Sequence, residues 1–276
     1  MAPGTADVGP IAEAVAGGGV VVLSGAGIST ESGIPDYRGE TGSLRTHTPM
    51  TYGDFVASES GRQRYWARSH LGWRTIARAA PNTGHQAVAT LQARGHLTGV
   101  ITQNVDGLHQ AAGARDVIEL HGNLDRVVCL DCGTTSAREA LDRRLRAANP
   151  EFEGEATRIN PDGDVELPDD IVRTFTVVPC TVCGGVLKPD VVFFGENVPK
   201  PRVERCYRLI DDANAVLVLG SSLTVMSGFR FVRHAAKAGK SVLIINQGVT
   251  RGDPYADHRV NLPLGRALAD LTDRLT

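Results

Sequence analysis

Four cysteines stand in two closely spaced pairs, Cys129-x-x-Cys132 and Cys180-x-x-Cys183. Thiolates at this spacing bind Zn²⁺ in a tetrahedron, and four protein ligands leave no open position at which a water could react. The pairs therefore predict a structural zinc site that stabilises a small insertion over residues 128–185. A redox-active disulfide and a nucleic-acid-binding ribbon are the alternatives, although this insertion lacks the basic and aromatic face that such a ribbon needs.

A glycine-containing loop follows the apolar run at residues 20–23, which has the pattern of a buried parallel strand. Gly25 and Gly27 let the backbone approach a phosphate, and the N–H groups beyond them can face an anion. The third glycine of the common dinucleotide fingerprint is absent, since Thr30 occupies its place, so the glycines alone predict only a tight turn. Residues 32–39 then form a polar segment with both charge signs, which favours a binding loop.

Polar motifs follow most of the predicted strands at their carboxyl ends. In an open parallel sheet, ligands bind in the crevice outside those ends. Any one of these loops could be an ordinary turn, but the whole set predicts a binding crevice. The motifs are Ser24-Gly25-Ala26-Gly27, Gln103-Asn104-Val105-Asp106, His121-Gly122-Asn123, Gly195-Glu196, Gly220-Ser221-Ser222 and Asn246-Gln247-Gly248.

His121 is the candidate general base. An imidazole has a pKa near ~6.5 and is suited to proton transfer at neutral pH. His121 directly follows the expected strand at residues 117–120, which places it at the edge of the crevice. A histidine at a strand end is by itself more often a loop or capping residue, and that simpler interpretation holds for His85 and His109. The polar context of His121 favours catalysis.

The elements that must position these side chains follow from the hydropathy pattern. Short apolar runs alternate with helical spacings along most of the chain, which is typical of a parallel sheet covered on both faces. We therefore predict an α/β fold built on such a sheet. The expected strands are 20–23, 99–102, 117–120, 191–194, 216–219 and 242–245, and the expected helices are 8–18, 85–91, 201–213, 227–239 and 266–274.

Two segments interrupt this alternation. Residues 45–80 combine aromatic and apolar side chains with many arginines and predict a small helical module. Residues 128–185 carry the cysteine pairs and an acidic, proline-containing stretch, and form the predicted zinc-binding insertion. The remaining residues, 1–44, 81–127 and 186–276, are assigned to the domain that contains the parallel sheet.

Composition restricts the class of protein. With 276 residues, 42% of them hydrophobic, the chain can bury a sizeable core, and its net charge of −2 gives no footprint for nucleic acid. No apolar run is long enough to cross a membrane, and the first residues resemble neither a signal peptide nor a transit peptide. We therefore expect a cytoplasmic protein, and the preference for arginine over lysine suggests a GC-rich bacterial genome. The sequence does not determine the oligomeric state.

Taken together and in order, the motifs resemble those of the sirtuin family, from about residue 10 to the C-terminus. The resemblance rests on the cysteine pairs and on Gly25-Ala26-Gly27-Ile28-Ser29, Ser32-Gly33-Ile34-Pro35-Asp36-Tyr37-Arg38, Thr102-Gln103-Asn104-Val105-Asp106, His121-Gly122-Asn123, Phe194-Gly195-Glu196 and Gly220-Ser221-Ser222. Residues 62–68, 130–133 and 161–165 further resemble the class II, mitochondrial lipoamidase-type branch.

The resemblance implies an NAD-dependent protein-lysine deacylase with a Rossmann-type large domain. The zinc insertion and the helical module would form a small domain, and NAD and an acylated lysine would meet between the two. The acyl oxygen would attack the ribose carbon as nicotinamide leaves, after which His121 would deprotonate a ribose hydroxyl. Asn104 would order a water, and Asp106 would accept a hydrogen bond from the carboxamide N–H group of NAD. Both residues are therefore assigned to the catalytic set with His121. The residues assigned to NAD are Gly25, Ala26, Gly27, Ser29, Asp36, Tyr37, Arg38, Gln103, Asn104, Val105, Asp106, Gly220, Ser221, Ser222, Asn246, Gln247, Gly248 and Leu264.

An acylated-lysine protein substrate is expected to lie as an extended strand, bound by main-chain hydrogen bonds. Tyr65 and Arg68 share a helix face, and a charge-assisted bond from the arginine could hold an acidic acyl group. Related sirtuins that remove dicarboxylic acyl groups have a similar Tyr-x-x-Arg. The alternative is a packed aromatic residue beside a solvated arginine. The residues expected along the substrate strand are Val192, Phe193, Phe194, Gly195 and Glu196.

Three other functions start from the same residues. A zinc-dependent NAD dehydrogenase needs an open metal position, which four cysteine ligands deny. A non-catalytic module that binds NAD or ADP-ribose would have no need of His121. A protein mono-ADP-ribosyltransferase begins with the same bond cleavage, and the sequence does not separate it from a deacylase.

Overall fold

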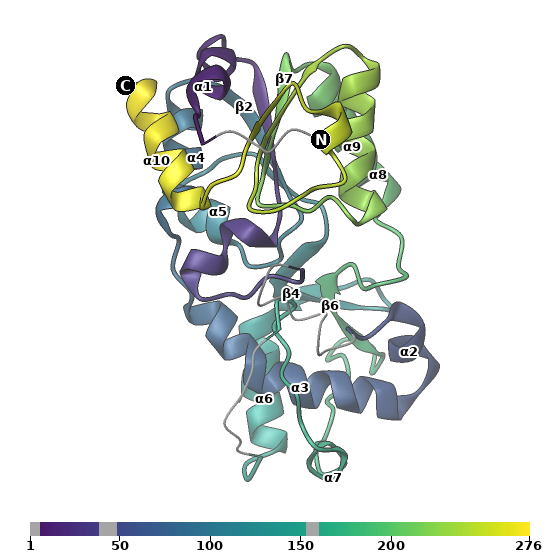
Figure 1. Cartoon of the computed structure of the whole chain (residues 1–276). Coiled ribbons are helices and arrows are strands. Elements are labelled where there is room, and N and C mark those ends of the chain that lie inside the picture. The colour runs from purple at the N-terminus through teal and green to yellow at the C-terminus, as the bar shows by residue number, and fades with distance from the viewer. Residues whose placement is uncertain (1–5, 39–48, 153–159) are drawn as a thin grey trace.

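The computed structural model describes residues 6–38, 49–152 and 160–276. They form two parts, one above the other in Figure 1, and the helix α1 (Gly9–Ala16) and the C-terminus both lie in the upper, larger part. The larger part contains a parallel sheet, and the smaller part contains the cysteine pairs together with the longest helix, α3 (Glu59–Arg78).

The sheet of the larger part has the strand order β3-β2-β1-β7-β8-β9. Every neighbouring pair in it is parallel. The chain order reverses between β1 and β7, and in open α/β sheets ligands bind at such a switch point. The strands are β1 (Val20–Ser24), β2 (Leu97–Thr102), β3 (Val117–Glu119), β7 (Ala215–Leu219), β8 (Ser241–Ile245) and β9 (His258–Val260).

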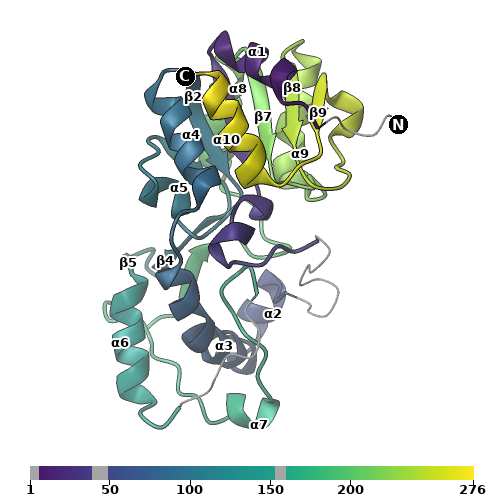
Figure 2. The ribbon, with the colours of Figure 1, turned by 60° about the vertical axis from the view of Figure 1, so that its left-hand side comes forward.

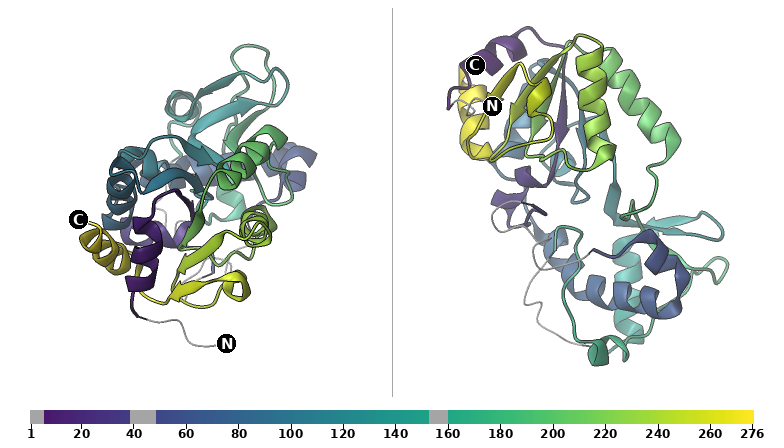
Figure 3. Two further views of the ribbon diagram at one scale, coloured as in Figure 1. Left: turned by 90° about the horizontal axis from the view of Figure 1, so that it is seen from above. Right: turned by 45° about the vertical axis from the view of Figure 1, so that its right-hand side comes forward.

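Helices cover both faces of this sheet, as predicted (Figure 2). Successive residues of a strand point to opposite faces, so Val20 and Val22 pack with α1, α4 and α10, whereas Val21 and Leu23 pack with α8 and α9. The view from above in Figure 3 shows the sheet between these two helical layers. The bounds are α1 (Gly9–Ala16), α4 (Thr83–Ala93), α8 (Lys200–Asp211), α9 (Met226–Lys237) and α10 (Leu264–Arg274), and the short α5 (Leu108–Ala111) follows β2.

The smaller part packs helices against a three-stranded sheet of order β5-β4-β6. Both pairings in this sheet are antiparallel. Its core is rich in aromatic residues, among them Phe55, Tyr65 and Trp66, and the Trp66 indole donates a 3.1 Å hydrogen bond to the carbonyl of Leu187 in β6. The elements are α2 (Tyr52–Ala57), α3, β4 (Gly122–Cys129), β5 (Thr135–Ala137), α6 (Arg138–Ala148), α7 (Asp169–Val172) and β6 (Leu187–Val191).

The prediction of a parallel strand at residues 191–194 is wrong. The chain forms β6 instead, which ends at Val191 and pairs with β4 in the small antiparallel sheet. The run is buried, as its apolar character predicts, but Val191 and Phe193 lie in the aromatic core of the smaller part. Hydropathy detects burial and does not tell which of two cores a strand enters. The domain boundaries remain a prediction.

Among the described residues, no helix combines the length and the apolar character that a membrane span requires.

Candidate active site and metal centre

The glycine loop after β1 lies against the loop after β7. The N–H of Gly27 donates a 2.9 Å hydrogen bond to the carbonyl of Gly220. A Cβ on Gly27 would stand 2.9 Å from the Cα of Gly220, and one on Gly25 would stand 2.8 Å from the Cβ of Ser221. These two glycines are therefore required because two loops of the crevice touch at the switch point. Gly220 in turn packs on Leu264, the first residue of α10.

Ser29 joins the loops that follow β1 and β2. Its hydroxyl donates to Oδ2 of Asp106 over 2.7 Å and accepts from Nδ2 of Asn104 over 3.0 Å. Asp106 is held through its other oxygen, which accepts the N–H of Leu108 over 3.0 Å. His85 lies 3.4 Å from the same hydroxyl. The structure thus brings the predicted site residue Ser29 together with Asn104 and Asp106, which are 75 and 77 positions away in the sequence.

Gln103 connects three strand ends. Its side-chain amide donates to the carbonyl of Ser24 over 3.2 Å and to the hydroxyl of Ser221 over 2.9 Å. Ser222 follows with its hydroxyl 3.0 Å from that of Thr224. After β8, Nδ2 of Asn246 donates to the carbonyls of the next two residues, Gln247 and Gly248. The loops after β1, β2, β7 and β8 therefore all lie at one edge of the sheet, as predicted.

His121 is fixed through both ring nitrogens. Nδ1 lies 2.9 Å from the carbonyl oxygen of Gln103, and Nε2 lies 2.8 Å from the hydroxyl of Ser227, at the start of α9. Burial lowers the pKa of His121 to about 4, so the imidazole is neutral at physiological pH. The next residue must be glycine, since Gly122 has a φ of 86° and a Cβ there would overlap the carbonyl of Asp190.

The predicted substrate strand begins beside His121. The N–H of Val192 donates a 2.8 Å hydrogen bond to the carbonyl of His121. Phe193 is held by its own N–H, which donates to Oε2 of Glu196 over 2.9 Å, and Phe194 meets the ring of Tyr37 with centroids 6.0 Å apart. Gly195, next in this turn, has a φ of 80°. The segment therefore reaches the crevice even though it does not belong to the parallel sheet.

Tyr37, which is predicted to belong to the cofactor loop, is half-buried and packs on Phe194. Burial, followed by the carboxylates of Asp162 and Asp164, raises the pKa of its phenol well above the ordinary value. Burial also lowers the pKa of the adjacent Arg38. Tyr37 thus lies near the loop that carries the two aspartates.

Tyr65 and Arg68 are both buried. Tyr65 packs on Phe193, with ring centroids 5.1 Å apart, as the packed-aromatic alternative predicts. Arg68 is not solvated: Nε lies 3.3 Å from Asp164, and Nη2 donates to Glu166 over 2.7 Å. The predicted contact of these side chains with an acyl group stays a prediction.

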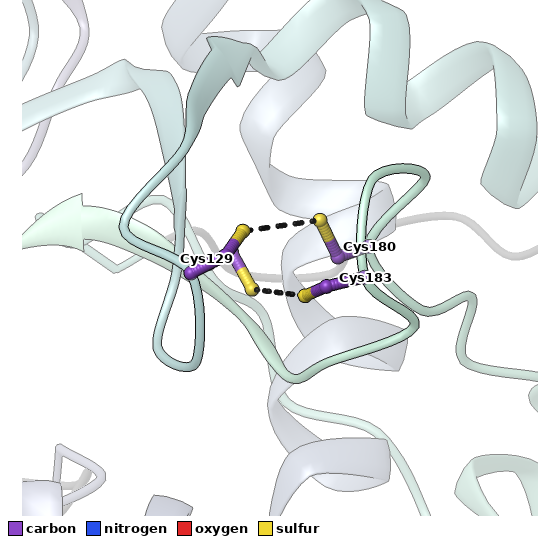
Figure 4. Close-up of side chains that lie close together, drawn as sticks. Cys129, Cys180 and Cys183 are labelled. Atoms are coloured by element: carbon purple, nitrogen blue, oxygen red, sulfur yellow. Dashed lines mark hydrogen bonds between the residues drawn. The ribbon is translucent and has the colours of Figure 1, made fainter.

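The four predicted cysteine ligands converge. The sulfur of Cys129 lies 3.6 Å from that of Cys183, and Cys132 lies 3.9 Å from Cys180, with all four sulfurs within 4.8 Å of one another. Figure 4 shows Cys129 facing Cys180 and Cys183 across two loops. A tetrahedron with Zn–S bonds of about 2.3 Å has sulfurs about 3.8 Å apart, so the cluster fits zinc.

The structure confirms the structural roles that are predicted for His85 and His109. Nε2 of His109 lies 2.8 Å from the hydroxyl of Ser24, and burial lowers its pKa to about 3. Nδ1 of His85 accepts the N–H of Asn82 in the capping box of α4. Sequence reasoning missed Ser227 altogether, because a serine in the first turn of a helix carries no signal for a partner 106 positions away.

The fold and the site define a Rossmann-type nucleotide-binding protein with a four-cysteine metal centre. A protein-family model described as "Sir2 family" matches residues 25–227. The NAD-dependent protein deacetylase 1 of Streptomyces coelicolor is 66% identical over 275 residues, which cover 100% of this chain and 92% of the relative. The protein of the same name in Mycobacterium avium is 48% identical over 281 residues, which cover 100% of this chain and 98% of the relative.

Solved structures agree. One described as "Sir2-p53 peptide-NAD+" has a TM-score of 0.78 at 28% identity and covers 97% of this chain and 98% of its own. A second, described as "Structural Basis for the Mechanism and Regulation of Sir2 Enzymes", has a TM-score of 0.76 at 31% identity and covers 96% of both. The chain belongs to the Sir2, or sirtuin, family.

Proposed function

We propose that this protein is an NAD-dependent protein-lysine deacylase that transfers the acyl group of a modified lysine to ADP-ribose. One observation carries the proposal. His121 lies where the nucleotide-binding loops and the predicted substrate strand meet. Its neutral imidazole is bonded to the carbonyl of Gln103, and its backbone carbonyl accepts the N–H of Val192. A binding module would have no use for a base at that junction.

Bound NAD supplies the ADP-ribose that accepts the acyl group once its bond to nicotinamide is broken. The chain contributes the residues that orient the dinucleotide. The backbone of the two loops that meet at Gly27 and Gly220 would lie against the pyrophosphate. Ser221 would offer the dinucleotide a hydroxyl that Gln103 already positions. Asp106, fixed through Ser29 and Leu108, keeps a carboxylate in place for a carboxamide N–H donor.

His121 acts as the base. A carbonyl oxygen can only accept a hydrogen bond, so the proton of the neutral ring resides on Nδ1, which donates to Gln103. Nε2 therefore carries the lone pair that takes the proton of a ribose hydroxyl. The low pKa of this buried ring keeps the lone pair available throughout the physiological range.

The substrate is an acylated lysine in an extended peptide. Residues 192–196 lie next to His121 and meet Tyr37 through Phe194, which supports a lysine channel between the two parts of the molecule. Zinc held by the four cysteines would have no open position, so its role would be structural. Residues 62–68, 130–133 and 161–165 support the class II branch, and the bacterial relatives support a cytoplasmic enzyme of a bacterium.

The test is product analysis by mass spectrometry, with NAD and peptides carrying acetyl, succinyl or lipoyl lysine. We expect nicotinamide, the free-lysine peptide and acyl-ADP-ribose in equal amounts. His121→Ala should lower deacylation at least about 100-fold. His258→Ala, which removes an exposed histidine in β9, should leave it unchanged. ADP-ribose attached to the peptide or to the enzyme, without release of acyl-ADP-ribose, would instead identify a mono-ADP-ribosyltransferase.

A further inference from the structure

Ser227 occupies the hydrogen-bonding position at Nε2 of His121. Its hydroxyl lies 2.8 Å from this nitrogen, and the two residues are 106 positions apart in the chain. Ser227 is the second residue of α9, only a few residues after the Ser221-Ser222 turn of the nucleotide-binding edge. The helix start thus contacts the base directly.

The tautomer of His121 fixes the direction of this bond. The proton on Nδ1 is donated to the carbonyl of Gln103, so Nε2 has only a lone pair to offer. The hydroxyl of Ser227 must therefore donate. A donor at Nε2 stabilises the neutral ring and disfavours its protonated form.

The packing of α9 explains how the hydroxyl comes so close. Gly228 lies against the side chain of Gln103, where a Cβ would stand 2.5 Å from Oε1. The first turn of the helix therefore rests on Gln103, the same residue whose carbonyl holds Nδ1 of His121. A larger residue at position 228 would separate Ser227 from the imidazole.

The charged neighbours of the ring also oppose its protonation. Arg202, on α8, donates to the carbonyl of Leu120 over 3.3 Å, and its charge lowers the pKa of His121 after burial itself. Glu119, on β3, forms an ion pair with Arg126 and therefore does not offset the effect of Arg202 on the imidazole. Ser227 lies in the first turn of α9, at the positive end of the helix dipole, and this turn contains no acidic residue.

We propose that Ser227 is a positioning residue of the reaction: its hydroxyl holds the His121 ring by Nε2, keeps that nitrogen unprotonated, and marks the place that a ribose hydroxyl takes when substrate binds. This rests on the proposed function of His121. Because Nε2 accepts one strong hydrogen bond, the incoming hydroxyl replaces that of Ser227, and its proton passes to the same lone pair.

The first experiment needs no substrate. The histidine ring signals of the free protein are followed by NMR as a function of pH, and the His121 signal is identified by its loss in His121→Ala. Ser227→Ala should raise the pKa of His121 by about 0.5–1 pH unit, since one hydrogen bond to the neutral ring is worth about 1 kcal/mol. Ser227→Thr keeps the hydroxyl and should keep the pKa. An unchanged pKa in Ser227→Ala would refute the contact.

The second experiment measures the reaction in two stages. Exchange of labelled nicotinamide into NAD reports bond cleavage, which precedes the action of the base, and release of free-lysine peptide reports the whole sequence. Ser227→Ala should lower the ratio of deacylation to exchange by about 3- to 10-fold at neutral pH. The acid limb of its kcat/KM profile should move to higher pH.

Met226→Ala is the matched control, because it alters the exposed neighbour in the same helical turn. It should change neither the ratio nor the profile. A normal ratio in Ser227→Ala, despite a raised pKa of His121, would refute the positioning role. A parent enzyme that releases no free lysine with any acyl peptide would refute the proposed function while leaving the NMR result intact.

Discussion

The backbone N–H of Val192 donates to the carbonyl oxygen of His121 over 2.8 Å, so the predicted substrate strand and the predicted base share one hydrogen bond. The same strand is anchored at its far end by Glu196, which accepts the N–H of Phe193 and lies 3.0 Å from Nζ of the buried Lys188. The two contacts fix the segment between the base and the small sheet.

This anchoring predicts an effect of Glu196 on peptide binding. Glu196→Ala leaves the Phe193 N–H and the Lys188 ammonium without this partner, so the strand should shift. We expect the KM for an acyl peptide to rise about tenfold and the KM for NAD to change little. Glu196→Gln, which retains an acceptor, should fall between the parent and Glu196→Ala. Equal increases in both KM values would count against a role confined to the peptide.

The metal centre should be needed for the fold of the smaller part. Removing zinc with a chelator, or replacing Cys180 by serine, should lower the melting temperature by several degrees and release the metal. Cys206→Ala is the control, since Cys206 is buried among α8 and the parallel sheet and takes no part in the cluster. It should retain one zinc per chain by elemental analysis. Full zinc content in Cys180→Ser would contradict the assignment.

The buried histidines predict a loss of stability in acid. Burial lowers the pKa of His121 to about 4 and that of His109 to about 3, whereas an unfolded histidine titrates near ~6.5. Between these values the unfolded chain binds more protons, so stability falls as the pH drops below ~6.5. The expected loss by pH 5 is on the order of 2 kcal/mol per histidine. Urea unfolding at several pH values measures it, and His109→Asn should show a shallower slope than the exposed control His258→Ala.

Removing the Arg68 side chain should lower the free energy of unfolding. Its bonds to Asp164 and Glu166 join α3 to the loop before α7, and Arg68→Ala would leave the buried carboxylate of Asp164 without this counter-charge. We expect a loss of about 3 kcal/mol and little change in the ratio of activities on acetyl and succinyl peptides. A selective loss of succinyl activity would instead establish the acyl contact suggested by the Tyr-x-x-Arg spacing.

Apolar runs predicted the parallel sheet because its central strands are buried on both faces, as β1 and β7 show. The polar edge followed from the same reasoning, since the carboxyl ends of parallel strands gather at one side. The strands β5 and β9 escaped prediction because each has three residues and no apolar run. Partners set by tertiary packing, such as Ser227 for His121 and Asp164 for Arg68, had no local signal.

One strand links the two chemical centres of the molecule. β4 begins directly after the base and ends at Cys129, so eight residues of extended chain, roughly 25 Å, run from the imidazole to a thiolate. We therefore expect metal occupancy to influence catalysis through this strand. Demetallation would loosen the far anchor of that strand, and proton transfer would slow although nothing near the nucleotide had been altered.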